Sequence, residues 1–511
     1  MIASTTQHLR LNPLDHFPPS NYNFFVSYLP LKDGVTPQEV FEVLHESLVR
    51  LFRELPWLSG KVWPESPSTP GWRPGQLEIR YTTSDFEDEA NLPLRHLVMN
   101  HLRPEELRGM TFDDLREKGF PFDAFEDEQL IRHELLPRFE DGPDVMAVQA
   151  NFMPGACLLV SGVQHAVSDG TSYFDVAKVF AGHCESLQKP GAPVAEPISA
   201  ECSDRRILDV VWEKEGTGTP MDKIDSVSWG LLDLQRPGSP TRPEAAKSLK
   251  TLSKDQMQAG MFYVSPDKFV ALRKRCAAAA AAAAAATSGS STSSRVSGND
   301  ALTALIWRGM LKAKYKAALA AGRIREDDEH LPEARLFSTV DGRPNMSKSQ
   351  ALPMVYLGNL FFIHLCKLPL RTLAAPDTRL GAVAEDIRAV LHKSTHAVLQ
   401  DAYTLARQVD DLNKIRFNRG HTPGSFDIVI SSFLMFPYDG TAWGTKVFAN
   451  GGRPYAVRPL MRRFARASQF CFVLPRKRNG AVEFVLTLYE DEMKILLEDD
   501  EFAEWALYYS F

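Results

Sequence analysis

A histidine and an aspartate four positions apart offer the clearest opportunity for proton-transfer chemistry in this chain. His165 follows the apolar, strand-like run Cys157–Gln164, and Asp169-Gly170 leads into a helical pattern that starts at Thr171. An imidazole with a reference pKa of about 6.5 can be neutral at working pH and accept a proton from an attacking alcohol or amine. Rigid scaffolds often present catalytic groups where a buried strand ends. His165 is therefore a candidate general base.

The same spacing leaves structural alternatives open. His165 could be hydrogen-bonded into its loop without any catalytic role, and Asp169 could cap the following helix instead of pairing with the imidazole. Two residues at this spacing could also share a metal ion. However, Gly170 follows, and no second histidine or cysteine lies nearby, so we expect no metal site.

A hairpin has to deliver His165 to its position. Residues 144–153 and 157–164 are apolar strand patterns, and Pro154-Gly155 is typical of the turn between them. Earlier in the chain we expect a strand over 22–29, a helix that begins with a capping box at 36–39, and a strand over 77–82. The acidic segment 84–142 predicts irregular structure with short helices.

The second half begins after a stretch rich in Gly, Pro and Ser at 214–250, which is typical of a long crossover. Ser265-Pro266-Asp267 predicts a helix start, and the alanine tract at 277–286 can extend that helix because alanine has the highest helix propensity. Residues 287–294 are almost all Ser, Thr and Gly and should be mobile. The remaining patterns predict helices over 301–308, 380–409 and 490–505 and strands over 337–340, 360–365, 427–436, 470–474 and 482–488.

Size and composition narrow the class of protein. With 511 residues the chain is long enough for two domains, and 44% hydrophobic and 24% charged residues are typical of a soluble globular protein. The net charge of −6 without a dense Lys/Arg stripe argues against nucleic acid as a partner. We expect no membrane span and no signal peptide. The six scattered cysteines indicate reduced thiols in a reducing compartment, so we expect a cytoplasmic protein. We also expect a monomer.

The motif His165-x-x-x-Asp169-Gly170, with a hairpin before it and a helix after it, resembles the active-site motif of BAHD-type acyl-CoA-dependent acyltransferases, in particular the fungal trichothecene O-acetyltransferase-like branch. Peptide-synthetase condensation domains share the motif, but a second histidine usually precedes the catalytic one, and Gln164 stands there in this chain. Further segments resemble the family in the expected order: the turn from Glu54 to Val62 with Gly60, Ser297 to Trp307, Asp341-Gly-Arg343, Tyr356 to Asn359, Ser431-Ser432-Phe433 and Gly440 to Gly444.

The resemblance implies an α/β fold. It predicts two similar chloramphenicol-acetyltransferase-like α/β domains with mixed sheets flanked by helices, joined by a long crossover loop. On this basis we assign residues 1–213 to the N-terminal domain, 214–255 to the linker and 256–511 to the C-terminal domain. The last of these contains the flexible Ala/Ser-rich insertion at 277–297.

The resemblance also implies roles for individual residues. His165 would take the proton of an acceptor hydroxyl as that hydroxyl attacks an acyl-CoA, within a ternary complex and without a covalent acyl-enzyme. Arg343 would pair with Asp169, which together with Gly170 would then shape the site instead of activating His165. Ser431 or Ser432 would stabilise the oxyanion. For the CoA phosphates, the candidates are Ser265 and Lys268, at a predicted helix N-terminus.

The implied activity is O-acyl transfer, with acetyl as the expected acyl group and a hydroxylated secondary metabolite as the expected acceptor. Acyl-CoA, such as acetyl-CoA, would be a co-substrate, and no tightly bound cofactor is expected. Two alternatives remain. One is a condensation-type acyltransferase that uses carrier-bound acyl groups, and the other is a non-catalytic binding protein of the same fold, suggested by the altered segment from Gly440 to Gly444.

Overall fold

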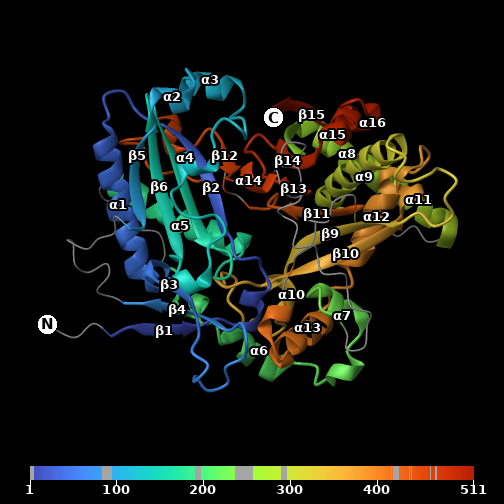
Figure 1. Cartoon of the computed structure of the whole chain (residues 1–511), viewed down its shortest axis with the longest axis horizontal. Helices are drawn as coiled ribbons and strands as arrows, with labels where there is room; N and C mark the ends of the chain where they lie inside the picture. The colour runs from blue at the N-terminus through green and yellow to red at the C-terminus, as the bar shows by residue number, and fades with distance from the viewer. Residues whose placement is uncertain are drawn as a thin grey trace.

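The structure is a computed structural model that describes residues 5–82, 95–189, 197–235, 257–288, 296–415, 417, 425–436, 438, 440–460, 462–465 and 469–510. Two mixed β-sheets of five and seven strands, each flanked by helices, lie side by side (Figure 1). The expected α/β class with two such halves is confirmed. The proposed domain boundaries at 213 and 256 stay a prediction.

The first sheet has the strand order β12-β2-β7-β6-β5 and carries the candidate base at the end of one strand. The strands are β2 (Tyr22–Pro30), β5 (Leu97–His101), β6 (Met146–Met153), β7 (Ala156–Gln164) and β12 (Val457–Pro459). The predicted hairpin is confirmed: β6 and β7 pair antiparallel around Gly155, whose φ of 75° suits a residue without a side chain. β5 pairs parallel to β6, a strand that the sequence patterns did not predict.

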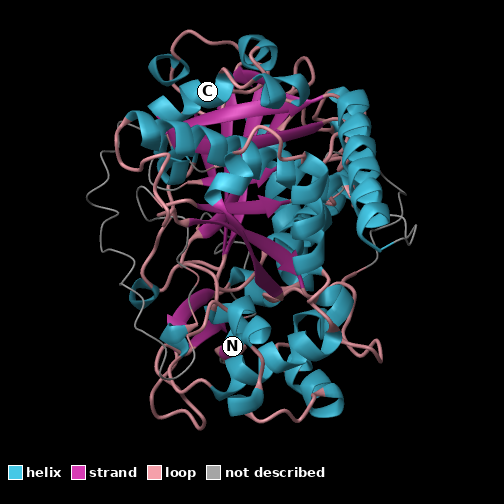
Figure 2. Cartoon of the chain, turned by 90° about the vertical axis from the view of Figure 1, so that its right-hand side faces the viewer, coloured by secondary structure: helices cyan, strands magenta, loops and turns pink. Residues whose placement is uncertain are grey.

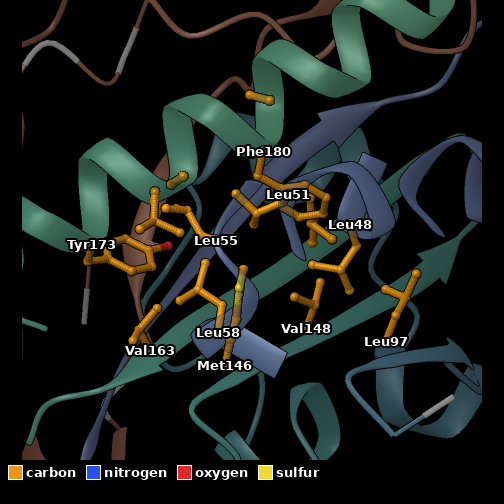
Figure 3. Packing of buried hydrophobic residues seen from close by; sticks show 14 of the residues in the cluster. Leu48, Leu51, Leu55, Leu58, Leu97, Met146, Val148, Val163, Tyr173 and Phe180 are labelled. Carbon is orange, nitrogen blue, oxygen red and sulfur yellow. The ribbon is translucent and has the colours of Figure 1, made fainter. Parts of the chain in front are cut away.

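Helices α1 (Pro37–Glu54) and α5 (Gly170–Gln188) cover one face of this sheet. Leu48 and Leu51 of α1 pack with Val148 of β6 and Phe180 of α5 in one buried cluster (Figure 3). Helix α1 begins as expected, because Thr36 and Glu39 form a capping box. Segments between β5 and β6 cover the opposite face. These contain α2 (Pro104–Leu107), α3 (Phe112–Glu117) and α4 (Asp127–Leu130).

The second sheet has the order β10-β9-β11-β13-β14-β8-β15. Its strands are β8 (Met257–Val264), β9 (Glu333–Asp341), β10 (Phe361–Pro369), β11 (Asp427–Ser432), β13 (Phe470–Val473), β14 (Val482–Tyr489) and β15 (Leu507–Ser510). Among these described strands, only β11 pairs in parallel, with β9 and with β13. Helices pack along the strands (Figure 2), among them α8 (Pro266–Ser288), α9 (Gly298–Ala320), α12 (Leu380–Leu391), α15 (Glu490–Leu497) and α16 (Asp500–Trp505).

Smaller elements complete the chain. A three-stranded sheet contains β1 (Gln7–Arg10), β4 (Leu77–Tyr81) and β3 (Lys61–Pro64). The remaining helices are α6 (Ile207–Glu215), α7 (Ser226–Leu231), α10 (Arg343–Met346), α11 (Leu370–Ala374), α13 (His396–Gln408) and α14 (Arg462–Ala465). Short 3-10 helices are η1 (Pro13–His16), η2 (Pro56–Ser59), η4 (Phe139–Asp141), η5 (Ala200–Ser203), η6 (Met221–Lys223), η8 (Leu412–Lys414) and η9 (Asn450–Gly452).

Several expected elements differ in their bounds. The single helix expected over 380–409 is two helices, because Thr395 caps α13 with its side chain. Asp499 likewise caps α16 and divides the last predicted helix, after which β15 joins the sheet. The crossover contains the short helix α7, and residues 236–256 lie outside the described part of the chain. Helix α8 includes the alanine tract, while residues 289–295 of the expected flexible insertion also lie outside the described part.

Strand β12 connects the two halves. It lies at residues 457–459, late in the chain, yet it pairs antiparallel with β2 at the edge of the first sheet (Figure 1). Arg458 of β12 is buried and donates to Glu483 Oε2 of β14 in the second sheet at 2.9 Å. The charge pair therefore joins a strand of one sheet to a strand of the other.

No helix among the described residues is long and apolar enough to cross a membrane. Within the same residues, no group of three or more His, Cys, Asp or Glu side chains is placed to hold a metal ion.

Removing Arg458 should loosen the connection between the sheets. Arg458→Met leaves the buried Glu483 carboxylate without its main partner, so we expect the free energy of unfolding to fall by about 3 kcal/mol. Arg458→Met combined with Glu483→Leu should recover much of this loss. The control is Arg138→Met, because the Arg138 side chain is 74% exposed. Thermal unfolding of the four proteins tests this, and an unchanged midpoint in Arg458→Met would contradict it.

Candidate active site

A cavity of about 290 Å³ lies between the two sheets and is lined from both. The first half contributes His165 and Thr171, and the second contributes Asp341, Ser431 and Ser432. Much of the remaining wall is aromatic, with Phe24, Phe25, Phe361, Phe417, Phe433, Phe436, Phe470 and Phe472. The structure therefore brings the predicted base and both predicted oxyanion donors to one apolar cavity.

The backbone holds His165 in place at the end of β7. Its N–H donates to the carbonyl of Asn21 at 2.7 Å, just beyond the paired residues Tyr22 and Gln164. Its own carbonyl accepts a bond of 2.9 Å from Asn359 Nδ2. The ring stacks at a tilt against Phe361, with 5.7 Å between centroids. The imidazole is partly exposed, but its Nδ1 is buried and has no hydrogen-bond partner among the described residues.

Burial lowers the pKa of His165 below its ordinary value of 6.5, because a charged imidazolium is poorly solvated in this site. The negative charge of Asp169 opposes this effect but does not cancel it. The imidazole is therefore neutral at neutral pH, the state that a proton acceptor requires.

Asp169 uses its carboxylate for contacts other than His165. Oδ1 accepts from the N–H of Ser172 at 3.0 Å and so caps α5, while Oδ2 accepts from the N–H of Leu360 at 2.8 Å. Arg343 donates to both oxygens, at 3.0 and 3.1 Å. Burial alone would raise the pKa of Asp169, but Arg343 and the amide donors outweigh it and hold the pKa below its usual range.

Arg343 is a buried residue that forms hydrogen bonds with both halves of the chain. It also donates to Asp341 Oδ1 at 2.8 Å, to Ser172 Oγ at 2.8 Å and to the carbonyls of Tyr356 and Gly358. Its side chain is only 3% exposed. The geometry fits the expectation that Asp169 and Arg343 hold the loop, since neither carboxylate oxygen of Asp169 bonds to the imidazole in the described structure.

Gly170 allows α5 to approach the loop after β11. A Cβ at this position would lie 2.7 Å from Cε1 of Phe433, closer than side-chain atoms can pack. Any larger residue would therefore require either the Phe433 ring or the start of α5 to shift. This contact gives a steric reason for the glycine of the motif.

The two serines at the end of β11 differ in their hydroxyl partners. Ser432 Oγ donates to Asn299 Oδ1 at 2.7 Å. Ser431 Oγ lies 3.1 Å from Thr339 Oγ1, and either hydroxyl can be the donor of that bond. Because a serine has a single O–H, Ser432 has already used its donor, whereas Ser431 can accept from Thr339 and keep its own O–H for a ligand.

Ser265 and Lys268 do not line this cavity. They lie at the start of α8, where the Lys268 N–H donates to Ser265 Oγ at 3.3 Å. The structure thus confirms the predicted helix start and leaves the predicted phosphate-binding role untested.

Asp15 and Asn359 hold the backbone of the His165 loop in place, a role that the sequence did not predict. Asp15 is fully buried, and its Oδ1 accepts from both the backbone N–H and the side-chain Nδ2 of Asn359, each at 3.0 Å. The same Nδ2 donates to the His165 carbonyl. A local signal existed, because Asn12-Pro-Leu-Asp15 is a capping box, but it gives no hint of a partner 344 positions away.

Comparison with known proteins agrees with this arrangement. The model of the Transferase family matches residues 133–503. The chain belongs to this family, the BAHD-type acyltransferases. The model of the trichothecene 3-O-acetyltransferase-like N-terminal domain matches residues 22–184. The predicted family and branch are therefore confirmed.

Relatives and solved structures agree with this assignment. The chain is 27% identical to an isocyanide synthase-NRPS hybrid of Aspergillus fumigatus over 98% of this chain, but it spans only 31% of that protein. It is 26% identical to an eremophilane O-acetyltransferase of Penicillium rubens, covering 98% of each. The crystal structure of F. graminearum TRI101 complexed with coenzyme A and deoxynivalenol has the same fold, with a TM-score of 0.73, 20% identity and coverage of 99% and 100%.

The contacts of Arg343 should be needed for the protein to fold stably. Arg343→Ala leaves the Asp169 carboxylate buried and unpaired, so we expect a loss of about 3 to 5 kcal/mol of stability together with activity. Thermal unfolding and the yield of soluble protein measure the loss of stability. Arg206→Ala is the control, because Arg206 is 85% exposed in its pair with Asp204 and should not shift the midpoint. Equal midpoints for both variants would remove the structural role of Arg343.

Proposed function

We propose that this acyltransferase transfers an acyl group, acetyl in the first instance, from acyl-CoA to a hydroxyl group of a secondary metabolite, with His165 as the general base. The observation that carries the proposal is the position of the His165 imidazole on the wall of an apolar cavity between the two sheets, where burial lowers its pKa below the ordinary value. Support for acetyl and for CoA comes from the eremophilane O-acetyltransferase and from the TRI101 complex, which contains coenzyme A.

The reaction needs a single proton carrier. His165 accepts the proton of the acceptor hydroxyl while the hydroxyl oxygen forms a bond to the thioester carbonyl carbon. Because Nδ1 is buried, the nitrogen left for this transfer is Nε2. The tetrahedral intermediate then expels the CoA thiolate, which takes the proton back from the imidazolium. Both substrates are bound together in this scheme, and no serine or cysteine becomes acylated.

Ser431 is the better candidate for the oxyanion donor. Thr339 can donate to Ser431 Oγ. The Ser431 O–H then has no acceptor among the described residues and can donate to a ligand. Ser432 donates to Asn299 and is therefore a weaker candidate. One well-placed donor contributes on the order of 10²-fold or more to the rate.

The cavity favours a neutral, largely apolar acceptor. Its described wall contains no lysine or arginine, and Asp341 would repel an acceptor that carries a carboxylate. The phenylalanines offer apolar contact to a carbon skeleton, and about 290 Å³ is near the lower end of typical small-molecule sites. A hydroxylated terpenoid, as in the eremophilane relative, fits these properties better than a charged metabolite.

Three further expectations belong to the proposal. Ser265 and Lys268 are candidates for holding CoA phosphates, because a helix N-terminus and a cation both favour anions. The six cysteines are buried and form no disulfide, which supports a reducing compartment such as the cytoplasm. A condensation-type reaction with carrier-bound groups is less favoured, because Gln164 is fully buried where such domains carry a second histidine.

Replacing His165 should abolish most of the catalysis. We expect His165→Ala to lower kcat by about 10²- to 10⁴-fold at an unchanged melting temperature. In the wild type, kcat/KM should decrease on the acid side of its pH profile with a midpoint below pH 6.5. Burial lowers the pKa of His165, and only the neutral ring accepts a proton. Transfer of acetyl from acetyl-CoA to a sesquiterpenoid alcohol across the pH range checks both. Near wild-type transfer by folded His165→Ala would refute the assignment.

The two serines form a matched pair of variants. Ser431→Ala should lower kcat by about 10²-fold with little change in KM, since an oxyanion contact forms only in the transition state. Ser432→Ala should have a much smaller effect on kcat. Steady-state kinetics of both variants provide the test, and a reversed order of the two effects would assign the oxyanion contact to Ser432.

A further inference from the structure

Gln469 lines the cavity, although no motif of the sequence includes it. It stands directly before β13, whose Phe470 pairs with Val429 of β11 and whose Phe472 pairs with Ser431. The side chain is buried, with 4% of the residue exposed. Gln469 is therefore a polar group in an aromatic part of the wall, directly before the strand that pairs with the strand of Ser431.

Two buried charges fix the orientation of the Gln469 amide. Lys314 of α9 donates to its Oε1, and its Nε2 donates to Glu492 Oε2 of α15 at 3.0 Å. Burial lowers the pKa of Lys314 and raises the pKa of Glu492, while the charge of each opposes the shift of the other. With Lys314 as an ammonium, which can only donate, and Glu492 as a carboxylate, which can only accept, the amide cannot be turned over without breaking both bonds. The oxygen and nitrogen of Gln469 are thus assigned by their partners.

This arrangement is costly to bury. Lys314 and Glu492 have side chains only 2% and 1% exposed, and their charged atoms are 3.7 Å apart. Apolar residues of similar size would often fill such a site at least as favourably. Glu492 also helps to cap α15, but that role requires neither Lys314 nor Gln469. Holding the Gln469 amide in one orientation would explain why Lys314 and Glu492 are buried beside it.

The amide nitrogen of Gln469 carries two N–H groups, and Glu492 takes one. The other has no acceptor among the described residues. We propose that Gln469 is a substrate-binding residue, whose second N–H donates to an oxygen atom of the substrate in the cavity. That oxygen is a carbonyl of the acyl-pantetheine arm or an oxygen of the acceptor. The inference rests on the proposed acyl transfer and adds a specific contact to it.

The test replaces Gln469 with methionine, which has a similar length but donates no hydrogen bond. We expect the KM for one substrate to rise about 10-fold, with kcat within about 3-fold of wild type, as for loss of one hydrogen bond made equally in ground and transition states. A higher KM for acetyl-CoA would assign the contact to the acyl donor. A higher KM for a sesquiterpenoid alcohol would assign it to the acceptor.

The matched control is Gln400→Met. Gln400 is also fully buried and donates to the Met346 carbonyl, but it does not line the cavity. If Gln469→Met fails to fold, Gln469→Asn shortens the side chain by one methylene, keeps an amide and should give the same rise in KM.

Unchanged KM values for both substrates, or an equal rise in Gln400→Met, would overturn the inference while the proposed function stands. A wild type that neither binds CoA in calorimetry nor transfers acetyl would overturn the proposed function and this inference with it.

Discussion

The buried ion pair between Asp169 and Arg343 is the interaction on which the site depends. Asp169 starts α5 in the first half, and Arg343 starts α10 in the second. Because both groups are buried, each requires the other, and any separation of the two halves at this point would leave a charge without solvent or partner. The contact also occupies Asp169, so its carboxylate forms no ion pair with His165, as the proposed role of a neutral base requires.

The second requirement is that two sheets meet along one cavity. His165 comes from the end of β7 and Ser431 from the end of β11, so neither sheet alone contains the site. Strand β12 crosses from the second half to pair with β2, and its Arg458 reaches back to Glu483 of β14. Gly170 lets α5 lie against Phe433. These contacts hold His165 of the first half and Ser431 of the second half at the same cavity.

The sequence predicted the parts of the site that have local patterns. The hairpin and the helix start around His165 follow from apolar periodicity and turn residues, and the pairing of Arg343 with Asp169 followed from resemblance to a family. The contacts of Asp15 with Asn359 and of Lys314 with Gln469 span 344 and 155 positions, and no local pattern can reveal partners so far apart. Element boundaries at Thr395 and Asp499 were missed because helical periodicity continues across the caps.

The proposed mechanism requires that the carboxylate of Asp169 makes no ion pair with His165, so that the imidazole is neutral. The most direct measurement is an NMR titration of protein labelled with ¹⁵N-histidine, in which the signal missing from His165→Gln identifies His165 among the 13 histidines. Burial of the ring predicts a midpoint below 6.5. A midpoint above 6.5 would contradict this arrangement, because it would show that a carboxylate stabilises the charged imidazole.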